Sequence, residues 1–353
     1  MAVDLGKFVS EVKHKISFEE LSGKCIAIDA FNTIYQFLSI IRQPDGTPLT
    51  DLKGRTTSHL SGLFYRNLNL IEHGIKPVYV FDGIPPHLKR RTLEARMSRR
   101  KEAFEAWEKA KAEGLTEEAR IKATASTKIN KEIIDSSKTL LTYMGIPFIQ
   151  APGEGEAQAA SLVRSGLVYA LTSQDYDSFL FGAETVIRNF AITGKRKLPR
   201  QNIYVNIDLE RIYLKDLLDS LKLNREQLII LGMLVGTDFN EGIEKIGPKT
   251  ALKIVSEYKT MDNIMGYVKK KYETWFDVDP YEVINIFEKP DVREISMQEF
   301  ENLKEKSSPD MDSMIKFMCD DYGFSKERIT KSSERIFESR KKENQKGIGL
   351  WMK

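Results

Sequence analysis

The sequence predicts an α/β protein with a central, mostly parallel, twisted sheet and helices on both faces. Three observations lead to this prediction. Residues 24–28 form a short apolar run typical of a strand, residues 30–41 carry apolar side chains at helical spacing, and residues 77–81 form a second strand-like run. Because strands that alternate with helices usually build parallel sheets, this order favours the α/β class over an all-helical or all-strand fold.

The first two strands each end on an acidic residue. The first leads directly to Asp29, and a helix then follows as far as Ile41. A loop rich in turn-forming residues and a helix over residues 58–73 connect to the second strand, which ends on Asp82. Ligand sites of parallel sheets lie outside the carboxyl ends of the strands, so both acids stand where functional side chains are expected.

The segment that follows the second strand has a different character. Two prolines prevent the strand from continuing, and residues 88–138 are helical and densely charged. The sequence Gly-Leu-Thr at 114–116 interrupts the helical pattern. We therefore expect a helical hairpin or a mobile arch between two parts of the sheet.

The first half of this segment is rich in basic residues. Many solvated helices look like this, but a position beside acidic strand ends favours contact with phosphates. Phe104 and Trp107 could then serve as apolar or stacking surfaces. The basic residues are Lys89, Arg90, Arg91, Arg96, Arg99, Arg100 and Lys101.

The sheet resumes after the charged segment. Residues 146–149 are strand-like, Pro152 and Gly153 end the strand, and Glu154 and Glu156 then fall near the N-terminus of a helix. Acidic residues in a first helical turn are common because they interact favourably with the helix dipole. Taken alone, the two glutamates are therefore weak evidence for a metal site.

Acidic residues recur at two further places of the same kind. A strand over residues 168–171 leads to Asp175 and Asp177, and an apolar helix over residues 228–235 is followed by Asp238. Five separate segments thus place acids at the end or start of an apolar element. Carboxylate oxygens are the ligands that Mg²⁺ prefers, so the repetition predicts a magnesium site.

The rest of the chain after the fourth strand is expected to be mainly helical. Residues 204–207 look like an edge strand or a hairpin, and from Asp208 onward the pattern is helical. A glycine turn then precedes Pro248 at the start of another helix. This arrangement exposes backbone N–H groups, which suit a nucleic-acid phosphate.

Composition excludes several classes of protein. The chain has 353 residues, 30% of them charged, with a formal net charge of only +3, so any nucleic-acid surface must come from local segregation of charge. Two cysteines form no disulfide framework, and four histidines have no zinc-ligand spacing. No apolar run is long enough for a membrane helix, and the N-terminus lacks the pattern of a signal peptide, so we expect an intracellular protein.

Taken together, these motifs resemble the flap endonucleases of the structure-specific 5′ nuclease superfamily, in particular the archaeal members. The resemblance extends over nearly the whole chain. The motifs that carry it are Ala-Ile-Asp-Ala at 27–30, Val-Phe-Asp-Gly-Ile-Pro-Pro at 80–86, Ala-Pro-Gly-Glu-Gly-Glu-Ala at 151–157, Ser-Gln-Asp-Tyr-Asp at 173–177 and Gly-Thr-Asp-Phe-Asn at 236–240.

The resemblance implies a nuclease core of the PIN-like type with two Mg²⁺ ions, although Mn²⁺ also accepts oxygen ligands. One ion would lie nearer Asp29, Asp82 and Glu154. The other would lie nearer Asp175, Asp177 and Asp238, with Glu156 between the two. One ion would activate the attacking water, and the other would stabilise the leaving oxygen.

The resemblance also assigns roles to residues that would contact DNA. Lys89 and Arg96 would contact the scissile phosphate from the base of the arch, and Tyr35 would stack on a base. The turn before Pro248 would grip the duplex backbone, in this family often with a bound K⁺. The other expected DNA contacts are Arg99, Arg100, Gly236, Gly247, Lys249 and Thr250.

The end of the chain is similar to the peptide by which such nucleases bind the sliding clamp, PCNA. In that peptide Gln, an aliphatic residue three positions later and two aromatic residues occupy a hydrophobic pocket. The corresponding residues here are Gln345, Ile348, Trp351 and Met352, and Met352 replaces the second aromatic residue.

The resemblance implies a single nuclease domain over residues 1–330, acting as a monomer. Its expected parts are the core at 1–83 and 139–240, the helical arch at 84–138, the helix-turn-helix duplex-binding part at 241–330, and a flexible tail at 331–353 that includes the clamp peptide at 345–352. The location would be the cytoplasm and nucleoid in an archaeal cell, or the nucleus in a eukaryotic one.

The expected activity is hydrolysis of a phosphodiester at the base of a 5′ flap, together with 5′-3′ exonuclease activity, in DNA replication and repair. A related 5′ exonuclease or a junction resolvase is the nearest alternative, and the modest arch and the clamp peptide favour flap cleavage over both. A DNA-binding clamp partner without catalysis would have lost acidic residues, and none is lost. A phosphatase would leave the arch and the Gly-Pro turn unexplained.

Overall fold

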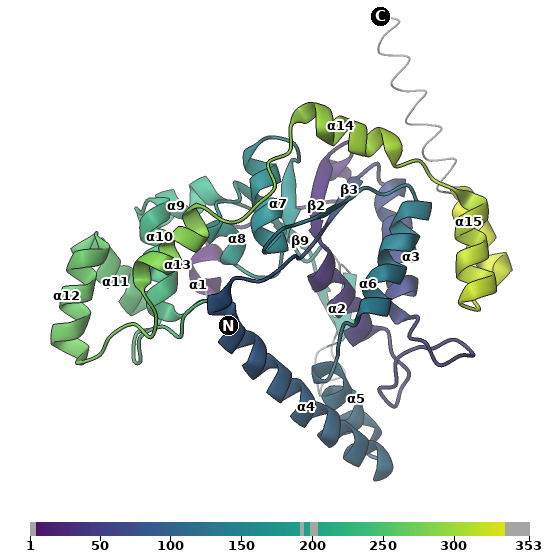
Figure 1. Cartoon of the computed structure of the whole chain (residues 1–353), viewed down its shortest axis with the longest axis horizontal. Coiled ribbons are helices and arrows are strands. Elements are labelled where there is room, and N and C mark those ends of the chain that lie inside the picture. The colour runs from purple at the N-terminus through teal and green to yellow at the C-terminus, as the bar shows by residue number, and fades with distance from the viewer. Residues whose placement is uncertain (1–4, 191–193, 198–203, 336–353) are drawn as a thin grey trace, which may run out of the picture.

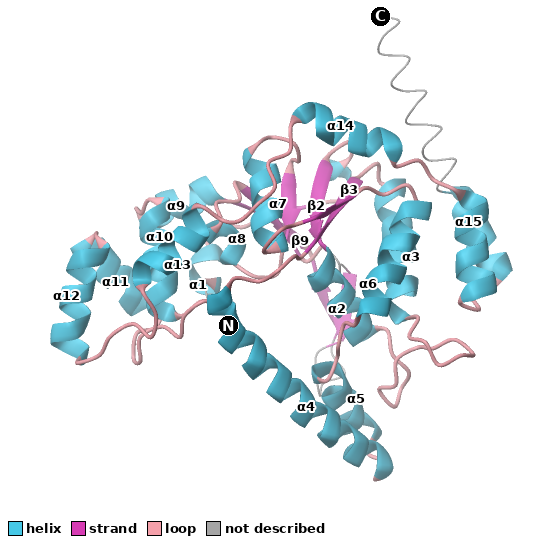
Figure 2. Cartoon of the chain, in the orientation of Figure 1, coloured by secondary structure: helices cyan, strands magenta, loops and turns pink. Residues whose placement is uncertain are grey.

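The computed structural model describes residues 5–190, 194–197 and 204–335. Within these residues a seven-stranded sheet has the order β1-β9-β6-β5-β2-β3-β4 (Figure 2). Its strands are β1 (His14–Ile16), β2 (Cys25–Asp29), β3 (Lys76–Phe81), β4 (Phe148–Gln150), β5 (Ala170–Thr172), β6 (Thr185–Arg188) and β9 (Leu209–Tyr213). The five strands from β6 to β4 are parallel, whereas β9 and β1 add two antiparallel pairings, so the predicted mostly parallel sheet is confirmed.

Helices cover both faces of this sheet, as predicted. They are α1 (Gly6–Val9), α2 (Ala30–Ile40), α3 (Ser58–Glu72), α4 (Arg90–Ala112), α5 (Thr116–Ala125), α6 (Lys131–Tyr143), α7 (Gly155–Arg164), α8 (Asp177–Leu180), α9 (Leu214–Leu221), α10 (Arg225–Val235), α11 (Pro248–Tyr258), α12 (Met261–Tyr272), α13 (Pro280–Glu288), α14 (Met297–Lys306) and α15 (Met311–Ile315). Two short 3-10 helices are η1 (Glu19–Leu21) and η2 (His87–Lys89), and η3 (Lys316–Asp321) is a π-helix. No helix of the described residues is both long and apolar enough to cross a membrane.

The sheet separates two hydrophobic clusters because successive side chains of a strand point to opposite faces. In β3, Val78 and Val80 belong to one cluster, with residues of α7 and α10. Tyr79 and Phe81 belong to the other, with residues of α2, α3 and α6. Both faces are therefore buried, which explains why the central strands are almost entirely apolar.

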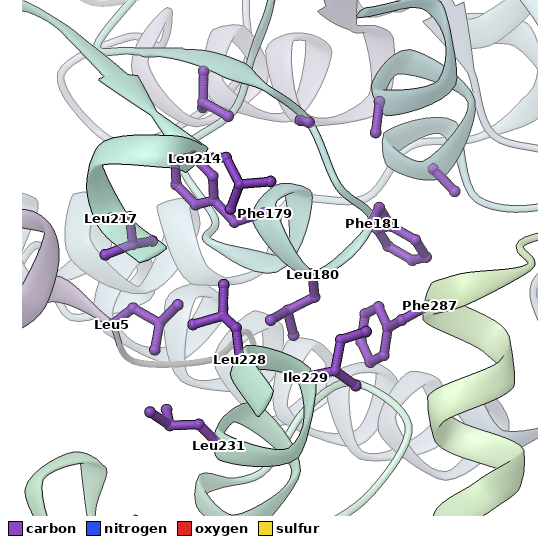
Figure 3. Packing of buried hydrophobic residues seen from close by; sticks show 14 of the residues in the cluster. Leu5, Phe179, Leu180, Phe181, Leu214, Leu217, Leu228, Ile229, Leu231 and Phe287 are labelled. Atoms are coloured by element: carbon purple, nitrogen blue, oxygen red, sulfur yellow. The ribbon is translucent and has the colours of Figure 1, made fainter. Parts of the chain in front are cut away.

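The first cluster continues beyond the sheet into the C-terminal helices (Figure 3). Phe181 follows α8, and its ring centroid lies 4.9 Å from that of Phe287 in α13. Leu228 and Ile229 of α10 are fully buried in the same cluster. Burial of each such side chain stabilises the fold by about 1.5–3 kcal/mol, so the helices that follow the sheet are packed firmly onto it.

One prediction about secondary structure was wrong. The segment after Asp208 was expected to be helical, but Leu209–Tyr213 form β9, which pairs with β6 and β1. Strands β1 and β6 were also not predicted. Residues 204–207 do form a hairpin, in which β8 (Tyr204–Ile207) pairs with β7 (Gly194–Lys197).

The charged segment forms a helical hairpin that projects away from the sheet (Figure 1). Its two arms are α4 and α5, and Gly114 turns the chain between them at a positive φ of 74°. Helix α6 begins inside the range 84–138 predicted for the arch, but its residues Ile133, Leu140 and Leu141 are buried in the core cluster of α3. The projecting part is therefore α4 and α5.

Candidate active site

A cleft of about 740 Å³ opens at the carboxyl ends of the parallel strands, beneath the base of α4. All seven carboxylates predicted to bind metal line it, and so do Tyr35 and the four predicted cations Lys89, Arg96, Arg99 and Arg100. The carboxylates are Asp29, Asp82, Glu154, Glu156, Asp175, Asp177 and Asp238. The structure therefore brings together side chains that are spread over more than 200 positions of the sequence.

The ends of β2 and β3 place the first two acids side by side. Asp29 is the last residue of β2 and caps α2, because its Oδ1 accepts a hydrogen bond of 2.9 Å from the backbone N–H of Asn32. Asp82 follows β3, and its Oδ1 accepts a bond of 2.7 Å from the N–H of Gly155. Both carboxylates are thus oriented by the N-termini of helices.

The loop before α7 brings Glu154 and Glu156 to the same place. Gly83 N–H donates to the carbonyl oxygen of Gly153 at 2.7 Å, which ties this loop to the end of β3. Gly155 lies directly against the carboxylate of Asp82, where a Cβ would overlap Asp82 Oδ1. A glycine is required there because the backbone itself packs on the acid.

Two further acids follow β5. Ser173 Oγ donates to Glu156 Oε1 at 2.8 Å and accepts from the backbone N–H of Asp175 at 3.0 Å. Asp177 begins α8 and is 5% exposed. Ser173 therefore links Glu156 of α7 to Asp175, a role that the sequence did not predict.

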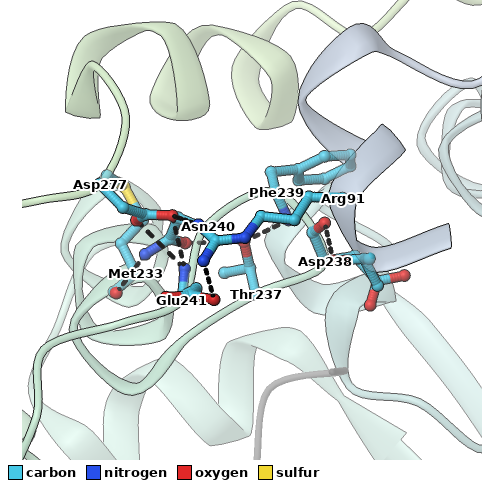
Figure 4. A network of polar contacts seen from close by, with 9 residues as sticks. Arg91, Met233, Thr237, Asp238, Phe239, Asn240, Glu241 and Asp277 are labelled. Carbon is cyan, nitrogen blue, oxygen red and sulfur yellow. Dashed lines mark hydrogen bonds and ion pairs between the residues drawn. The ribbon is translucent and has the colours of Figure 1, made fainter. Parts of the chain in front are cut away.

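Asp238 reaches the cleft from the loop after α10. Asn240 braces that loop, since its Nδ2 donates to Met233 O at 2.7 Å and its Oδ1 accepts from Thr237 Oγ1 at 2.8 Å. Arg91 of α4 contacts Glu241 at 2.6 Å in the same network (Figure 4). The base of the arch and the loop that carries Asp238 are thus held together.

Two cations of the arch base enter the cleft. Lys89 Nζ pairs with Glu154 and lies 3.5 Å from Asp238 Oδ2, and Arg96 donates to Asp238 Oδ1 at 2.5 Å. Thr92, one turn after Lys89, donates its hydroxyl to Asp238 O at 2.9 Å. Lys89 and Arg96 share one helical face, as their spacing of seven residues predicted.

The close carboxylates shift one another's pKa. Burial, together with the charge of Asp82, raises the pKa of Asp29 to about 7. Burial and the nearby charge of Asp177 raise the pKa of Glu156 well above its usual range. Burial opposes ionisation of Asp238 as well, but Lys89 and Arg96 favour the charged form, and the pKa of Asp238 is lowered.

These carboxylates suit a divalent metal by their chemistry. The donors are all hard carboxylate oxygens, and a bound cation would relieve the burial and mutual repulsion that raise the pKa values of Asp29 and Glu156. Lys89 already bridges Glu154 and Asp238, as a cation would. As the side chains stand, however, no three acid, histidine or cysteine side chains among the described residues are close enough to share an ion.

The outer part of the cleft is basic and aromatic. The guanidinium of Arg100 lies 5.6 Å from the ring centroid of Tyr35, within cation-π range. Arg99 and Arg100 line the cleft on the arch side. This wall can accommodate a phosphate backbone and a stacked base next to the carboxylates.

The remaining predicted DNA contacts lie on either side of the loop that carries Asp238. Gly236 ends α10 at a φ of 112°, and Gly247 caps α11, which begins with Pro248. Lys249 and Thr250 are exposed in the first turn of α11. None of these four residues lines the cleft. The clamp residues Gln345, Ile348, Trp351 and Met352 lie outside the described residues.

Comparison with known proteins gives a consistent result. The model of the XPG N-terminal domain matches residues 1–103, and that of the XPG I-region matches residues 145–238. Flap endonuclease 1 of Pyrococcus furiosus is 50% identical over 354 residues, covering 100% of both chains.

Solved structures agree with the sequence relatives. Flap endonuclease-1 from Methanococcus jannaschii has a TM-score of 0.72 and 34% identity, covering 96% of this chain and 98% of that one. The catalytic core of Rad2 in complex with DNA substrate has a TM-score of 0.67 and 25% identity, covering 96% and 100%.

Proposed function

The chain belongs to the flap endonuclease 1 family, and from this premise we propose that it cleaves 5′ flaps with two Mg²⁺ ions held by the seven carboxylates of the cleft. The single observation that supports this best is the convergence of all seven acids at the strand ends, directly beneath the basic base of the arch. The protein is a structure-specific 5′ flap endonuclease, which means that it binds DNA and cleaves it. A role in replication and repair is expected for this family.

We assign the acidic residues of the cleft to metal binding. Asp29, Asp82 and Glu154 would hold one ion, and Asp175, Asp177 and Asp238 the other, with Glu156 near both. When bound, such ions lower the pKa of a water and offset charge on the leaving oxygen of an in-line displacement. The helix N-termini and Ser173 orient the carboxylates before any ligand binds.

Lys89 and Arg96 would act on the scissile phosphate. Lys89 pairs with Glu154 and Asp238, and Arg96 pairs with Asp238, so both cations lie at the acids proposed to bind metal. A phosphate that enters the cleft can replace those carboxylates as their partner. Cations in this place stabilise the negative charge that develops in the transition state.

Specificity for the junction would come from shape and backbone contacts. The duplex would lie along the turn between α10 and α11, where Gly247, Lys249 and Thr250 are exposed and where K⁺ could bind. Tyr35, Arg99 and Arg100 would contact the strand next to the cut. We further propose that the protein is a monomer located with the DNA of the cell and that residues 345–352 bind the sliding clamp.

The test is cleavage of a 5′-labelled double-flap DNA with and without Mg²⁺. Single-stranded and blunt duplex DNA of the same sequence serve as controls. A single short product from the flap substrate, formed only with metal, is the expected result. Equal digestion of all three substrates would instead indicate a general 5′ exonuclease, and tight flap binding without digestion would indicate a non-catalytic clamp partner.

A further inference from the structure

Gln158 is a polar side chain with no exposed surface, at the end of the first turn of α7. Its Nε2 donates to Arg293 O at 2.9 Å, and its Oε1 accepts from Arg293 N–H at 2.7 Å. The two residues are 135 positions apart in the chain. The side-chain amide of Gln158 thus bonds both the N–H and the C=O of Arg293. We call this pair of hydrogen bonds, which joins α7 to a distant segment, the clip.

The distant segment, residues 289–296, connects α13 to α14 in an extended form and runs past α7 (Figure 1). We call it the strap. Val292 and Ile295 of the strap are half-buried against the hydrophobic cluster that includes α7. Asp291 O lies only 3.1 Å from the place where a Cβ of Gly153 would be, so the strap also packs on the loop before α7.

The clip holds the part of α7 that carries the two glutamates. Glu154 is the N-cap of α7, and Glu156 is in its first turn. The backbone N–H of Gln158 donates to Glu154 O at 3.1 Å, which closes this turn. The clip therefore adds an anchor to the turn that carries Glu154 and Glu156, beside the hydrogen bonds of Gly83 to Gly153 and of Gly155 to Asp82.

The strap begins at the helices assigned to duplex binding. It follows α13, where the ring centroid of Phe287 lies 5.2 Å from that of Phe239, the residue next to Asp238. Helix α13 also packs on α10, which precedes the Gly-Pro turn. A continuous path of packed residues thus leads from the duplex-binding side to the glutamates of the cleft.

We propose that Gln158 is a positioning residue, because its clip to the strap holds Glu154 and Glu156 in the arrangement that binds metal. This inference rests on the two-metal function proposed above. Gln158 does not line the cleft and would act through the first turn of α7. Partners of this kind, one step removed from the ligands, commonly tune metal affinity because they fix the orientation of the ligands.

The test compares three full-length variants with the wild type. Gln158→Met keeps the length and volume of the side chain but removes both hydrogen bonds. Arg293→Ala is the matched control, because the clip uses only the backbone of Arg293. Arg293→Pro removes the N–H donor and leaves α7 unchanged. Each is measured for Mg²⁺ binding to the DNA-free protein by calorimetry, for hydrogen exchange of the amides at 154–158, and for flap cleavage against Mg²⁺ concentration.

We expect Q158M and R293P to bind Mg²⁺ about tenfold more weakly than the wild type, with faster exchange at 154–158 and no change in KM for the flap. R293A should match the wild type. Wild-type Mg²⁺ affinity in Q158M and R293P would overturn the positioning role. If Q158M does not fold, R293P alone decides: weaker Mg²⁺ binding supports the positioning role, and wild-type binding overturns it. A wild type that cleaves flaps but binds no Mg²⁺ would refute the proposed metal function itself, and with it the role of Gln158.

Discussion

Asp177 is a buried acidic residue of the cleft and begins helix α8. Its charge, added to burial, raises the pKa of Glu156. We expect Asp177→Ala to reduce flap cleavage by at least about 100-fold, since a metal ligand is lost. Flap binding should stay nearly unchanged, because the basic contacts to phosphate remain.

Single-turnover cleavage and flap binding in the presence of Ca²⁺ measure these two effects separately. Asp135→Ala, which removes an exposed acid of α6, is the control and should behave as the wild type. An Asp177→Ala protein that still cuts at a near-normal rate would rule out its assignment to the metal site.

Substitution of Lys89 tests whether the base of the arch takes part in catalysis. Its pKa is raised because the attraction of Glu154 and Asp238 outweighs the effect of burial, so it stays charged at neutral pH. Lys89→Ala should lower the rate of cleavage by roughly 10²–10³-fold, as for the loss of other groups that stabilise transition-state charge. Lys109→Ala, at the exposed far end of α4, is the control for net charge. An equal loss in both variants would indicate a general electrostatic effect.

The raised pKa of Asp29 predicts how stability depends on pH. Its carboxyl has a pKa of about 7 in the folded protein, against about 4 in an unfolded chain. Between these values the folded state binds more protons, so the free energy of unfolding of the metal-free protein falls as pH rises from about 4 to about 7.

Thermal unfolding in EDTA at several pH values measures this effect. Asp29→Asn cannot titrate, so its Tm should fall less across the same range than that of the wild type. Parallel curves for the two proteins would show that Asp29 ionises normally. Saturating Mg²⁺ should also flatten the curve of the wild type, because a bound cation favours the ionised carboxylates.

At the scale of elements, the arch is attached to the core through the loop between α2 and α3. Gly46 of that loop lies beneath α5 at a φ of 84°, and a Cβ there would lie 2.6 Å from Ala123 Cβ. On the other arm, Trp107 Nε1 donates to Asp45 O at 3.2 Å, and Lys111 pairs with Asp45 at 3.1 Å. Both arms of the arch therefore rest on one short stretch of the loop.

Gly46→Ala measures how tightly α5 is seated there. The positive φ alone should lower the free energy of unfolding by about 1–2 kcal/mol, and the overlap with Ala123 should add to this loss. Gly54→Ala in the same loop is the matched control, because Gly54 has a φ of 78° but open space around it. If chemical denaturation gives the same loss for both variants, the arch is not packed on the loop in solution.

The sequence was sufficient for elements whose pattern is unambiguous. The strands that end at Asp29 and Asp82 are nearly continuous apolar runs, and these are the elements that position the acids. Strand β9 was mistaken for helix because Leu209 and Ile212, three positions apart, match helical spacing. In the sheet they lie on opposite faces, in different hydrophobic clusters. A strand buried on both faces has no alternation to reveal it.

The sequence predicted the acidic residues of the site but not the residues that support them. Ser173, Thr92 and Gln158 contact or support the acid-bearing segments, but a serine, a threonine or a glutamine in isolation has no distinctive pattern. Ser173 could have been suspected from its place in the motif that carries Asp175. The contact of Gln158 with Arg293 joins positions 135 residues apart, so only the folded chain shows it.

At the scale of the whole molecule, opposite charges are segregated although the net charge is only +3. The acids gather at the carboxyl edge of the sheet, and the cations gather on α4 above it. We therefore expect DNA to reach the acids past the arch, with its phosphates bound by these cations. This arrangement explains why overall composition gave no indication of nucleic acid, whereas the local order of charges did.

The tail should act separately from this catalytic body. Its clamp-like residues 345–352 lie outside the described residues, and we propose that they serve clamp binding and not catalysis. A variant without residues 340–353 should cleave flaps at the wild-type rate when no clamp is present and should lose stimulation by the clamp. Cleavage with and without purified clamp, together with direct binding measurements, tests both statements.

Met352 allows a sharper test of the same tail. An aromatic side chain buries more apolar surface in a pocket than methionine and loses less conformational freedom, so Met352→Phe should tighten clamp binding. Trp351→Ala should weaken it most, because it removes the one aromatic residue that the peptide has. Equal clamp affinity for the wild type, M352F and W351A would show that the clamp binds elsewhere on the chain, and stimulation would then persist in the truncated protein.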